Sequence, residues 1–412
     1  MLASIGISGT LTSCKKGCTD PEALNYNEKA KKEDPDSPCE YEVEEDFTIS
    51  SNITENTTWT TGNTYILTTR VAVTNGATLT IEPGVIIKGE AGEGANATAL
   101  IIARGAKINA VGTPAQPIIF TSIADEIEPG MIASPNLSVE MDALWGGLIV
   151  LGNAPISVAS GTEAQIEGIP ASDSNGKYGG NIETDNSGII QYVSIRHGGA
   201  NIGDGNEING LTLGGVGSAT TVDHIEIISN QDDGVECFGG TVNISDVVVL
   251  KTGDDGLDTD QGYSGTISNF IVYDAGDAAL ELDGPEGSDL GKGNHKFLNG
   301  SVYMENGSEL CDTDANTNVD FENVFWYGMT SDSYLHGMVF TELPSSTVVS
   351  PEFINLQADI PAGEAITDYF LSGSDASVTA VAVGSQTVGA NKSAFDSWTW
   401  TAIHSDNYLS QF

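Results

Sequence analysis

Short runs of β-branched and aromatic residues, in which apolar and polar positions alternate, recur along the chain from about residue 60. Glycine, asparagine, aspartate and proline separate the runs, so each one is typical of a β-strand followed by a turn. Apolar residues do not recur at spacings of three and four, so the pattern does not favour helices. The expected strands are Thr64–Thr68, Arg70–Val73, Thr78–Ile81, Val85–Lys88, Ala99–Ala103, Lys107–Val111, Ile118–Thr121, Trp145–Gly152, Tyr192–Arg196, His224–Ile228, Asp246–Leu250, Asn269–Tyr273, Asn299–Tyr303 and Asn323–Tyr327.

An acidic segment returns at a nearly fixed interval. Gln231–Phe238 recurs as Gly253–Asp260 and, less faithfully, as Gly276–Asp283, so that equivalent aspartates fall at positions 232, 254 and 277. Such a period is typical of a solenoid, in which each repeat buries its apolar face against its neighbours. We therefore predict an all-β fold, a right-handed single-stranded parallel β-helix with long loop inserts and a C-terminal cap. A β-sandwich, whose turns recur every ~8–12 residues, is the rival interpretation.

Three stretches interrupt the strand pattern, at 122–143, 157–188 and 284–292. Loops of this length usually have a function or are disordered, and we expect them to project beside the acidic segments. After about residue 340 the pattern fades, and a cap over the exposed strand edge is the expected role of 341–412. A separate glycan-binding module built on Trp398 and Trp400 is the alternative.

Charge narrows the choice of partners. The chain has 15 Lys+Arg against 58 Asp+Glu, a formal net charge of −43. Nucleic acid is excluded as a partner, because binding to phosphates needs clustered lysines and arginines. Anionic lipid surfaces should repel the chain. An acidic surface can serve solubility alone, or its carboxylates can collect divalent cations, for which Ca²⁺ is the natural match.

Stacked repeats would bring acids that are distant in sequence to within about 5 Å of one another, forming columns. Neighbouring carboxylates at that distance repel by about 1 kcal/mol even in water, which raises their pKa values or attracts a counter-ion. Two interpretations follow, a Ca²⁺ site and a solvated acidic face whose charges are screened. The candidate metal ligands, column by column, are Asp232, Asp254 and Asp277; Asp233 and Asp255; and Glu236, Asp258 and Glu281.

The segment Asn230–Gly234 is similar to the paired-aspartate motif of polygalacturonase-type β-helix hydrolases. The resemblance implies that two carboxyl groups could act as acid and base in glycoside cleavage. That family's downstream His-Gly and Arg-Ile-Lys elements are missing, and His197 lies one repeat upstream, where a turn histidine is the simpler interpretation. A Ca²⁺-dependent lyase would need a basic residue near the acids. If the protein is an enzyme, the catalytic candidates are Asp232, Asp233, Asp255, Asp258 and His197.

The beginning of the chain carries two short motifs. Leu11–Cys14 resembles a bacterial lipobox, which implies cleavage before Cys14 and lipidation of that cysteine, although no basic residues precede it. An ordinary secreted chain is the alternative. Gly17–Asn27, with Cys39 and Tyr41, resembles a Cys-bracketed module of secreted and surface proteins of the Bacteroidetes. That resemblance implies a Cys18–Cys39 disulfide, which would staple a segment too small to fold by burial alone.

The remaining cysteines are expected to be unpaired. In the three coils that follow, the positions equivalent to Cys237 are expected to be Thr259, Leu282 and Asp312. Cys311 would therefore lie in the neighbouring column, three coils away from Cys237. Three coils span roughly 14 Å, well beyond the ~7 Å limit between Cα atoms for a disulfide.

Further segments in 60–330 resemble a widespread group of bacterial surface β-helix proteins, often lipoproteins; they are Trp145–Gly147, Ser194–Gly199, Asn206–Thr212 and Asp232–Gly240. Together the motifs imply an exported lipoprotein on the outer membrane of a Gram-negative bacterium, binding or scaffolding a polysaccharide or an envelope protein, with Ca²⁺ as cofactor. The alternative is a Ca²⁺-dependent polysaccharide lyase or glycoside hydrolase. The expected organisation is a signal segment at 1–13, a lipidated tether with the stapled module at 14–57, the β-helix at 58–340 and the cap at 341–412.

Overall fold

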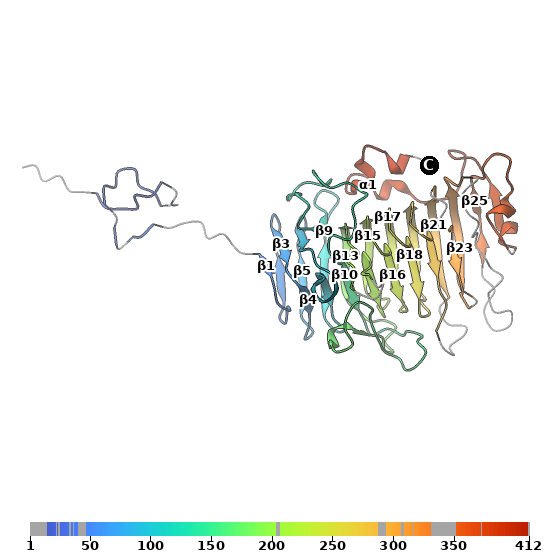
Figure 1. Cartoon of the computed structure of the whole chain (residues 1–412), viewed down its shortest axis with the longest axis horizontal. Helices are drawn as coiled ribbons and strands as arrows, with labels where there is room; N and C mark the ends of the chain where they lie inside the picture. The colour runs from blue at the N-terminus through green and yellow to red at the C-terminus, as the bar shows by residue number, and fades with distance from the viewer. Residues whose placement is uncertain are drawn as a thin grey trace, which may run out of the picture. The chain divides into compact units, whose positions relative to one another are not determined.

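The computed structural model divides into two compact units, Met1–Phe47 and Thr48–Phe412 (Figure 1). It describes residues 15–410 except 22, 24, 33, 36, 40–46, 203–206, 287–293, 306–308, 315, 331–351 and 372. Cys14, the predicted site of lipidation, lies outside the described residues. In the described part of the chain, no helix is long and apolar enough to cross a membrane.

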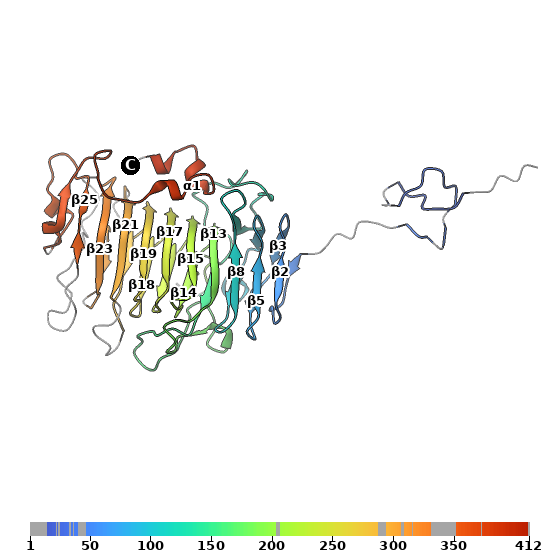
Figure 2. The ribbon, with the colours of Figure 1, turned by 180° about the vertical axis from the view of Figure 1, so that it is seen from behind.

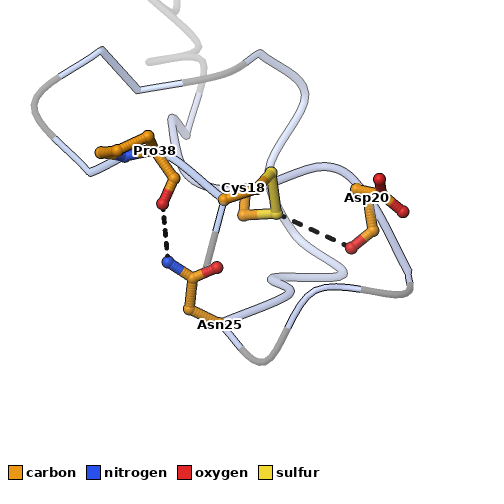
Figure 3. The surroundings of a disulfide bond; sticks show 5 residues. Cys18, Asp20, Asn25 and Pro38 are labelled. Atoms are coloured by element: carbon orange, nitrogen blue, oxygen red, sulfur yellow. Dashed lines mark hydrogen bonds between the residues drawn. A yellow bond between two sulfur atoms is a disulfide. The ribbon is translucent and has the colours of Figure 1, made fainter. Parts of the chain in front are cut away.

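The first unit is held by a disulfide between Cys18 and Cys39, whose Cα atoms are 4.8 Å apart (Figure 3). Around it, single β-bridges join Lys16 to Lys32 and Cys18 to Tyr26. The Asn25 side chain donates a hydrogen bond of 2.9 Å to the carbonyl of Pro38, beside the disulfide (Figure 3). Backbone turns and one covalent bond therefore take the place of a hydrophobic core in this small segment.

The second unit is a stack of coils whose strands pair in parallel with the coils before and after (Figures 1 and 2). Among the described residues, the larger of the two stacked sheets has 16 strands and the smaller has eight. The larger sheet joins two successive sides of the coil. The strands of the larger sheet are β1 (Thr48–Ile49), β2 (Thr57–Trp59), β3 (Thr64–Leu67), β5 (Thr78–Ile81), β6 (Ile86–Gly89), β8 (Lys107–Val111), β9 (Ile118–Ser122), β13 (Gly188–Arg196), β15 (Thr221–Ile228), β17 (Asn243–Leu250), β19 (Thr266–Tyr273), β21 (His295–Tyr303), β23 (Val319–Tyr327), β24 (Phe353–Ile354), β25 (Leu356–Ala358) and β26 (Val378–Ala380).

The smaller sheet forms the remaining side of the coil. Its strands are β4 (Arg70–Val73), β7 (Ala99–Ile102), β10 (Leu148–Leu151), β14 (Leu211–Gly214), β16 (Val235–Phe238), β18 (Leu257–Asp260), β20 (Leu280–Leu282) and β22 (Asp312–Thr313). An antiparallel pair, β11 (Ala164–Gln165) and β12 (Lys177–Tyr178), lies within an insert. The helical elements are α1 (Trp400–Ile403) and the 3₁₀ turns η1 (Gly94–Asn96), η2 (Ser174–Gly176), η4 (Ile366–Asp368), η5 (Ser374–Ser377), η6 (Lys392–Ala394) and η7 (Tyr408–Ser410).

The predicted parallel β-helix is confirmed, and the sandwich interpretation is wrong. Val235 pairs with Leu257 and Leu257 with Leu280, in the same register as the acidic repeats of the sequence. These side chains are buried, and each stabilises the fold by about 1.5–3 kcal/mol through removal of apolar surface from water. The predicted strands Arg70–Val73, Thr78–Ile81 and Lys107–Val111 have the same bounds as β4, β5 and β8, and the other predicted strands differ from those observed at their ends. The strands β14, β16, β18, β20 and β22 of the smaller sheet were not among the predicted strands.

The long strands turn a corner at a residue in the left-handed conformation, which the sequence did not reveal. Asparagine tolerates this conformation well, and it stacks into a hydrogen-bonded ladder in the later coils. Asn323 Nδ2 donates to Asn299 Oδ1 at 3.0 Å, and Asn355 Nδ2 donates to Asn323 Oδ1 at 3.1 Å. The corner column, in chain order, is Tyr192, His224, Asp246, Asn269, Asn299, Asn323 and Asn355.

The C-terminal region departs from the prediction. Strands of the stack continue to Ala380, so the β-helix does not end at 340. Residues 389–410, here called the C-terminal strap, run back along the ends of the long strands (Figures 1 and 2, red) rather than closing the end of the stack. Trp398 and Trp400 are buried against the coils. A glycan platform on these two tryptophans is therefore ruled out.

A buried ion pair fastens the strap to the coils. Arg196 and Glu226 lie 3.3 Å apart with both side chains fully buried, and Glu226 also accepts hydrogen bonds of 2.8 Å from the backbone and hydroxyl groups of Thr401. Arg196 donates to the carbonyl of Ile132 in the first insert and lies over the ring of Trp400. One charge pair thus joins a coil, an insert and the strap.

We expect Glu226→Gln to lower the free energy of unfolding by about 3–5 kcal/mol, because it leaves the Arg196 charge buried without its counter-charge. The matched control is Glu163→Gln, which removes the exposed ion pair between Arg104 and Glu163 and should cost at most about 1 kcal/mol. Urea denaturation of both variants checks this difference. Equal losses would contradict the role given to the buried pair.

Candidate functional site

The outward face of the smaller sheet changes character along the stack. One row of side chains, here called the outward row, is apolar in the early coils and acidic in the later ones. In register, it reads Ala72, Ile101, Ile149, Thr212, Glu236, Asp258, Glu281 and Asp312. The third predicted acid column, Glu236 with Asp258 and Glu281, is the later half of this row.

An insert covers the apolar half of the row. Ile166, Ile169 and Tyr178 of the loop between β10 and β13 pack against Ile101 and Ile149 (Figure 1, green). The insert is held at its carbonyls, because Arg70 donates to Gly168 at 2.9 Å and Arg104 donates to Gly179 at 2.8 Å. The prediction that this stretch lies beside the acidic coils agrees with its position. The first insert does not share that face, because Ile132 and Val139 contact Arg196 and Ser229 at the ends of the long strands.

Three carboxylates converge at the edge of this cover. Asp233, in the turn before β16, Glu236 on β16 and Asp258 on β18 each offer an oxygen within 4.8 Å of the others, and all three are buried. We call them the carboxylate cluster. A second group, Asp232, Asp233 and Asp254, meets the same distance limit and is more exposed. The solvated-face interpretation is wrong for the cluster, since its members expose only 6–8% of their surface.

Oxygen atoms in this cluster lack donors. Among the residues that the structure describes, Asp258 Oδ1 and Asn209 Oδ1 are buried without a hydrogen-bond partner, while Asn209 Nδ2 donates to Glu236. None of the lysines and arginines in the described ranges forms an ion pair with the three carboxylates. Buried acceptors and negative charge without compensation are costly, so the cluster needs protons or a cation.

Burial and the crowding of negative charge raise the pKa values of the acids at this site. Burial first, and then the charge of Asp258, holds the pKa values of Asp233 and Glu236 well above their usual range. Burial raises the pKa of Asp258 in the same way, with the charge of Glu281 adding to it. Burial, a hydrogen bond with Glu281 and the charge of Asp233 raise the pKa of Asp255 to about 11. The pKa of Asp232 rises to about 7, by burial and the charge of Glu167 in the insert.

The structure does not bring all eight predicted metal ligands together. Asp232, Asp233, Glu236, Asp254 and Asp258 fall in the two groups just described. Asp255 is buried beside Asp233. The backbone N–H of Asp255 donates a hydrogen bond of 3.0 Å to Asp233 Oδ1. Glu281 is the next acid in the outward row. Asp277 is exposed and falls in neither group.

Asn209 belongs to the site and was missed by the sequence argument. It stands two residues before β14, as Asp233 stands two residues before β16 and Asp255 two before β18. Extending the Asp233 column one coil toward the N-terminus would have found it.

His197 lies apart from these acids. Its Nδ1 is hydrogen-bonded to the carbonyl of Met141 at 2.5 Å, and its ring meets the edge of Trp400. Burial is the main cause that lowers its pKa to about 4. The five catalytic candidates thus separate into four acids near the cluster and a histidine under the strap.

The two other cysteines, Cys237 and Cys311, are buried and unpaired, as predicted. The column count was wrong by one residue, however. Leu282 pairs with Thr313 rather than Asp312, because the intervening insert shifts the register. Burial raises the pKa of both thiols, so neither is a reactive thiolate.

Comparison with family models places residues 51–318 in the pectate-lyase-like β-helix domain family, and the chain therefore belongs to that family. The match covers the predicted β-helix up to the end of the coil that contains Asp312. Searches of curated proteins and of solved structures gave no match.

With a chelator present, we expect stability to fall as pH rises from about 5 to 7. A carboxyl group with a raised pKa in the folded state binds its proton more tightly there than in the unfolded chain. Its contribution is full below about pH 4 and is lost through the folded pKa, at up to about 1.4 kcal/mol per pH unit for each group. Asp232, Asp260 and Asp283, whose pKa values rise to about 7, set this window.

Urea unfolding at several pH values in EGTA measures this slope. Asp258→Asn should reduce it, because the substitution removes one of the crowded carboxylates. The exposed Asp277→Asn should reduce it less, because its charge only adds to the raised pKa of Asp254, whose first cause is burial. Stability that rises with pH in the wild-type protein would contradict the raised pKa values.

Proposed function

We propose that this protein is a Ca²⁺-stabilised binding or scaffolding module that engages a glycan or an envelope protein at the bacterial surface. The observation that carries the proposal is the carboxylate cluster. Three buried acids lie within 4.8 Å of one another, and no basic side chain of the described residues neutralises them. A divalent cation would offset the repulsion with ligands that are already in place.

The donor set fits Ca²⁺ better than a softer metal. Asp233, Glu236 and Asp258 would supply carboxylate oxygens, and Asn209 Oδ1, a buried acceptor without a donor among the described residues, would supply an amide oxygen. Ca²⁺ takes 6–8 oxygen ligands at about 2.3–2.6 Å, so water would complete its shell. Zn²⁺ would prefer nitrogen or sulfur, and the cluster contains neither.

Fold and surface support a binding role. Members of a pectate-lyase-like family suit contact with polysaccharide along the outward face, and here the acids of the outward row continue beyond the insert to Asp312. The exposed part of this face is negative, so a neutral polymer, a basic protein segment, or an anionic glycan bridged by Ca²⁺ would fit its charge.

Cell-surface anchoring as a lipoprotein is part of the proposal. It rests on the Leu11–Cys14 motif and on the Cys-bracketed module of Bacteroidetes type, whose Cys18–Cys39 disulfide suits an oxidising, exported environment. The module would act as a stalk between the lipid anchor and the β-helix.

A second candidate function is Ca²⁺-dependent cleavage of a polysaccharide. The family description and the four acids near the cluster favour it. The position of His197 does not, because its ring is engaged with Met141 and Trp400 instead of the acids. The burial of Asp233 and Asp258 further restricts access of a sugar to the two carboxyl groups.

Ca²⁺ is expected to raise the melting temperature of chelator-treated protein at pH 7.5. Binding to the folded state alone stabilises it by about 2.7 kcal/mol when free Ca²⁺ is 100-fold above its Kd. Asp258→Asn should abolish this increase, and Asp277→Asn should retain it. Calorimetry and elemental analysis of the dialysed protein check the result. An unchanged melting temperature, with no calcium bound, would contradict the proposal.

Binding and cleavage are separated by a panel of neutral and acidic polysaccharides. We expect retention by at least one polymer in the presence of Ca²⁺ without new reducing ends or an unsaturated product. Turnover that is lost in Asp233→Asn and Asp255→Asn would establish the enzyme instead. These two variants distinguish an enzyme from a binding protein, because Asp233 and Asp255 are both catalytic candidates and both lie at the cluster.

A further inference from the structure

The corner column of the long strands changes composition partway along the stack. In the later coils it consists of asparagines, which suit its left-handed conformation. In strands β15 and β17 of earlier coils, the corner residues are instead His224 and Asp246. Asp223 precedes the histidine in β15. These three residues lie on a different side of the coil from the carboxylate cluster, in the larger sheet.

Their ligating atoms face one another. His224 Nδ1 is in contact with Asp223 Oδ1 and lies 3.7 Å from Asp246 Oδ2, and the three donor atoms all lie within 4.8 Å. Ligand atoms around a tetrahedral ion with ~2.0–2.2 Å bonds are about 3.3–3.6 Å apart, so small side-chain movements would seat a metal. The three side chains are 17–25% exposed, which leaves a path for an ion from solvent.

Each carboxylate is held by an amide from outside this group. Gln191 Nε2 donates to Asp223 Oδ2 at 3.2 Å, and Asn269 Nδ2 donates to Asp246 Oδ1. In both cases the second oxygen of the carboxylate is the one directed toward His224. Hydrogen bonds of this kind orient the ligands in protein metal sites and leave one oxygen of each carboxylate for the ion.

The imidazole is also fixed in place. Tyr192, one coil earlier, lies against it with ring centroids 4.2 Å apart, and Trp398 of the C-terminal strap lies 6.1 Å away. The same tryptophan meets Tyr192 edge-on at 5.5 Å. The strap and the neighbouring coil therefore restrict the ring orientation before any ligand binds, which lowers the entropic cost of coordination.

We infer that Asp223, His224 and Asp246 form a second metal site, selective for a first-row divalent ion such as Zn²⁺. One imidazole nitrogen and two carboxylate oxygens are a mixed donor set that favours such an ion over Ca²⁺. His224 would bind through Nδ1 and carry its proton on Nε2, and water would occupy the fourth position. Because Trp398 packs on the histidine, the bound ion would tie the strap to the coils.

The inference is independent of the Ca²⁺ site, and titration of full-length protein with Zn²⁺ tests it. Calorimetry of chelator-treated protein, with Ca²⁺ present to occupy the carboxylate cluster, should show one Zn²⁺ bound at this site. Co²⁺ in place of Zn²⁺ should give visible absorption bands that report nitrogen and oxygen ligation. Zn²⁺ should also raise the melting temperature.

The test variant is His224→Asn, because asparagine occupies the same corner position in the later coils and suits the left-handed backbone. It should weaken Zn²⁺ binding at least tenfold and remove the Co²⁺ bands, while unfolding of the metal-free protein changes little. His404→Gln, at the other surface histidine–aspartate pair, and Asp258→Asn, in the carboxylate cluster, should leave Zn²⁺ binding unchanged.

Two results would overturn the inference. One is unchanged Zn²⁺ affinity in His224→Asn. The other is a wild-type protein that binds no Zn²⁺ at pH 7.5, in which case His224 serves only as the hydrogen-bonded partner of Asp223 and the ion-pair partner of Asp246. A wild-type protein that binds Zn²⁺ but shows no increase in melting temperature with Ca²⁺ would contradict the proposed function and leave this inference intact. The two proposals can therefore be tested separately.

Discussion

In-register parallel stacking is the constraint on which this structure depends. Each coil places its residues over their counterparts in the coil before, at about 4.8 Å, so any column of like residues is either favourable throughout or unfavourable throughout. Aliphatic columns such as Val235, Leu257 and Leu280 build the core. Acidic columns accumulate repulsion in the same way, and this repulsion adds to burial, the main cause, in raising the pKa values of Asp233, Glu236 and Asp258.

The periodic part of the molecule could be predicted because equivalent residues of successive repeats show which positions stack on one another. The regular return of the acidic segment located the coils, the inward apolar residues and the Glu236 column without coordinates. The C-terminal limits of the long strands were accurate, from Arg196 in β13 to Tyr327 in β23, whereas the halves of these strands before the corner column were not predicted. Even the unpaired state of Cys237 and Cys311 followed from the number of coils between them, although the exact column did not.

The aperiodic parts could not be predicted, and they decide how the site behaves. Nothing in 157–188 indicates that Ile166 and Ile169 pack on the outward row, yet that cover is what turns an exposed acidic face into a buried cluster. The strap likewise has no repeat to place it. Its contacts with Glu226 and His224 join segments that lie far apart in the chain, which local sequence patterns do not encode.

The difference between amide and carboxylate columns accounts for where hydrogen-bond donors are lacking. An asparagine has both a donor and an acceptor, so Asn299, Asn323 and Asn355 satisfy one another along the corner. An ionised carboxylate is only an acceptor, so a column of carboxylates cannot do so.

Wherever acids replace amides in a column of this fold, the missing donors have to come from elsewhere. At the corner, Gln191, Asn269 and His224 supply part of them. On the outward row, Asn209 donates to Glu236 and the described side chains leave Asp258 Oδ1 without a donor. Protons can fill that deficit at low pH, and as the pH rises through the pKa values of the acids the proposed Ca²⁺ would fill it instead, which is why the proposal places the ligand at the acidic coils.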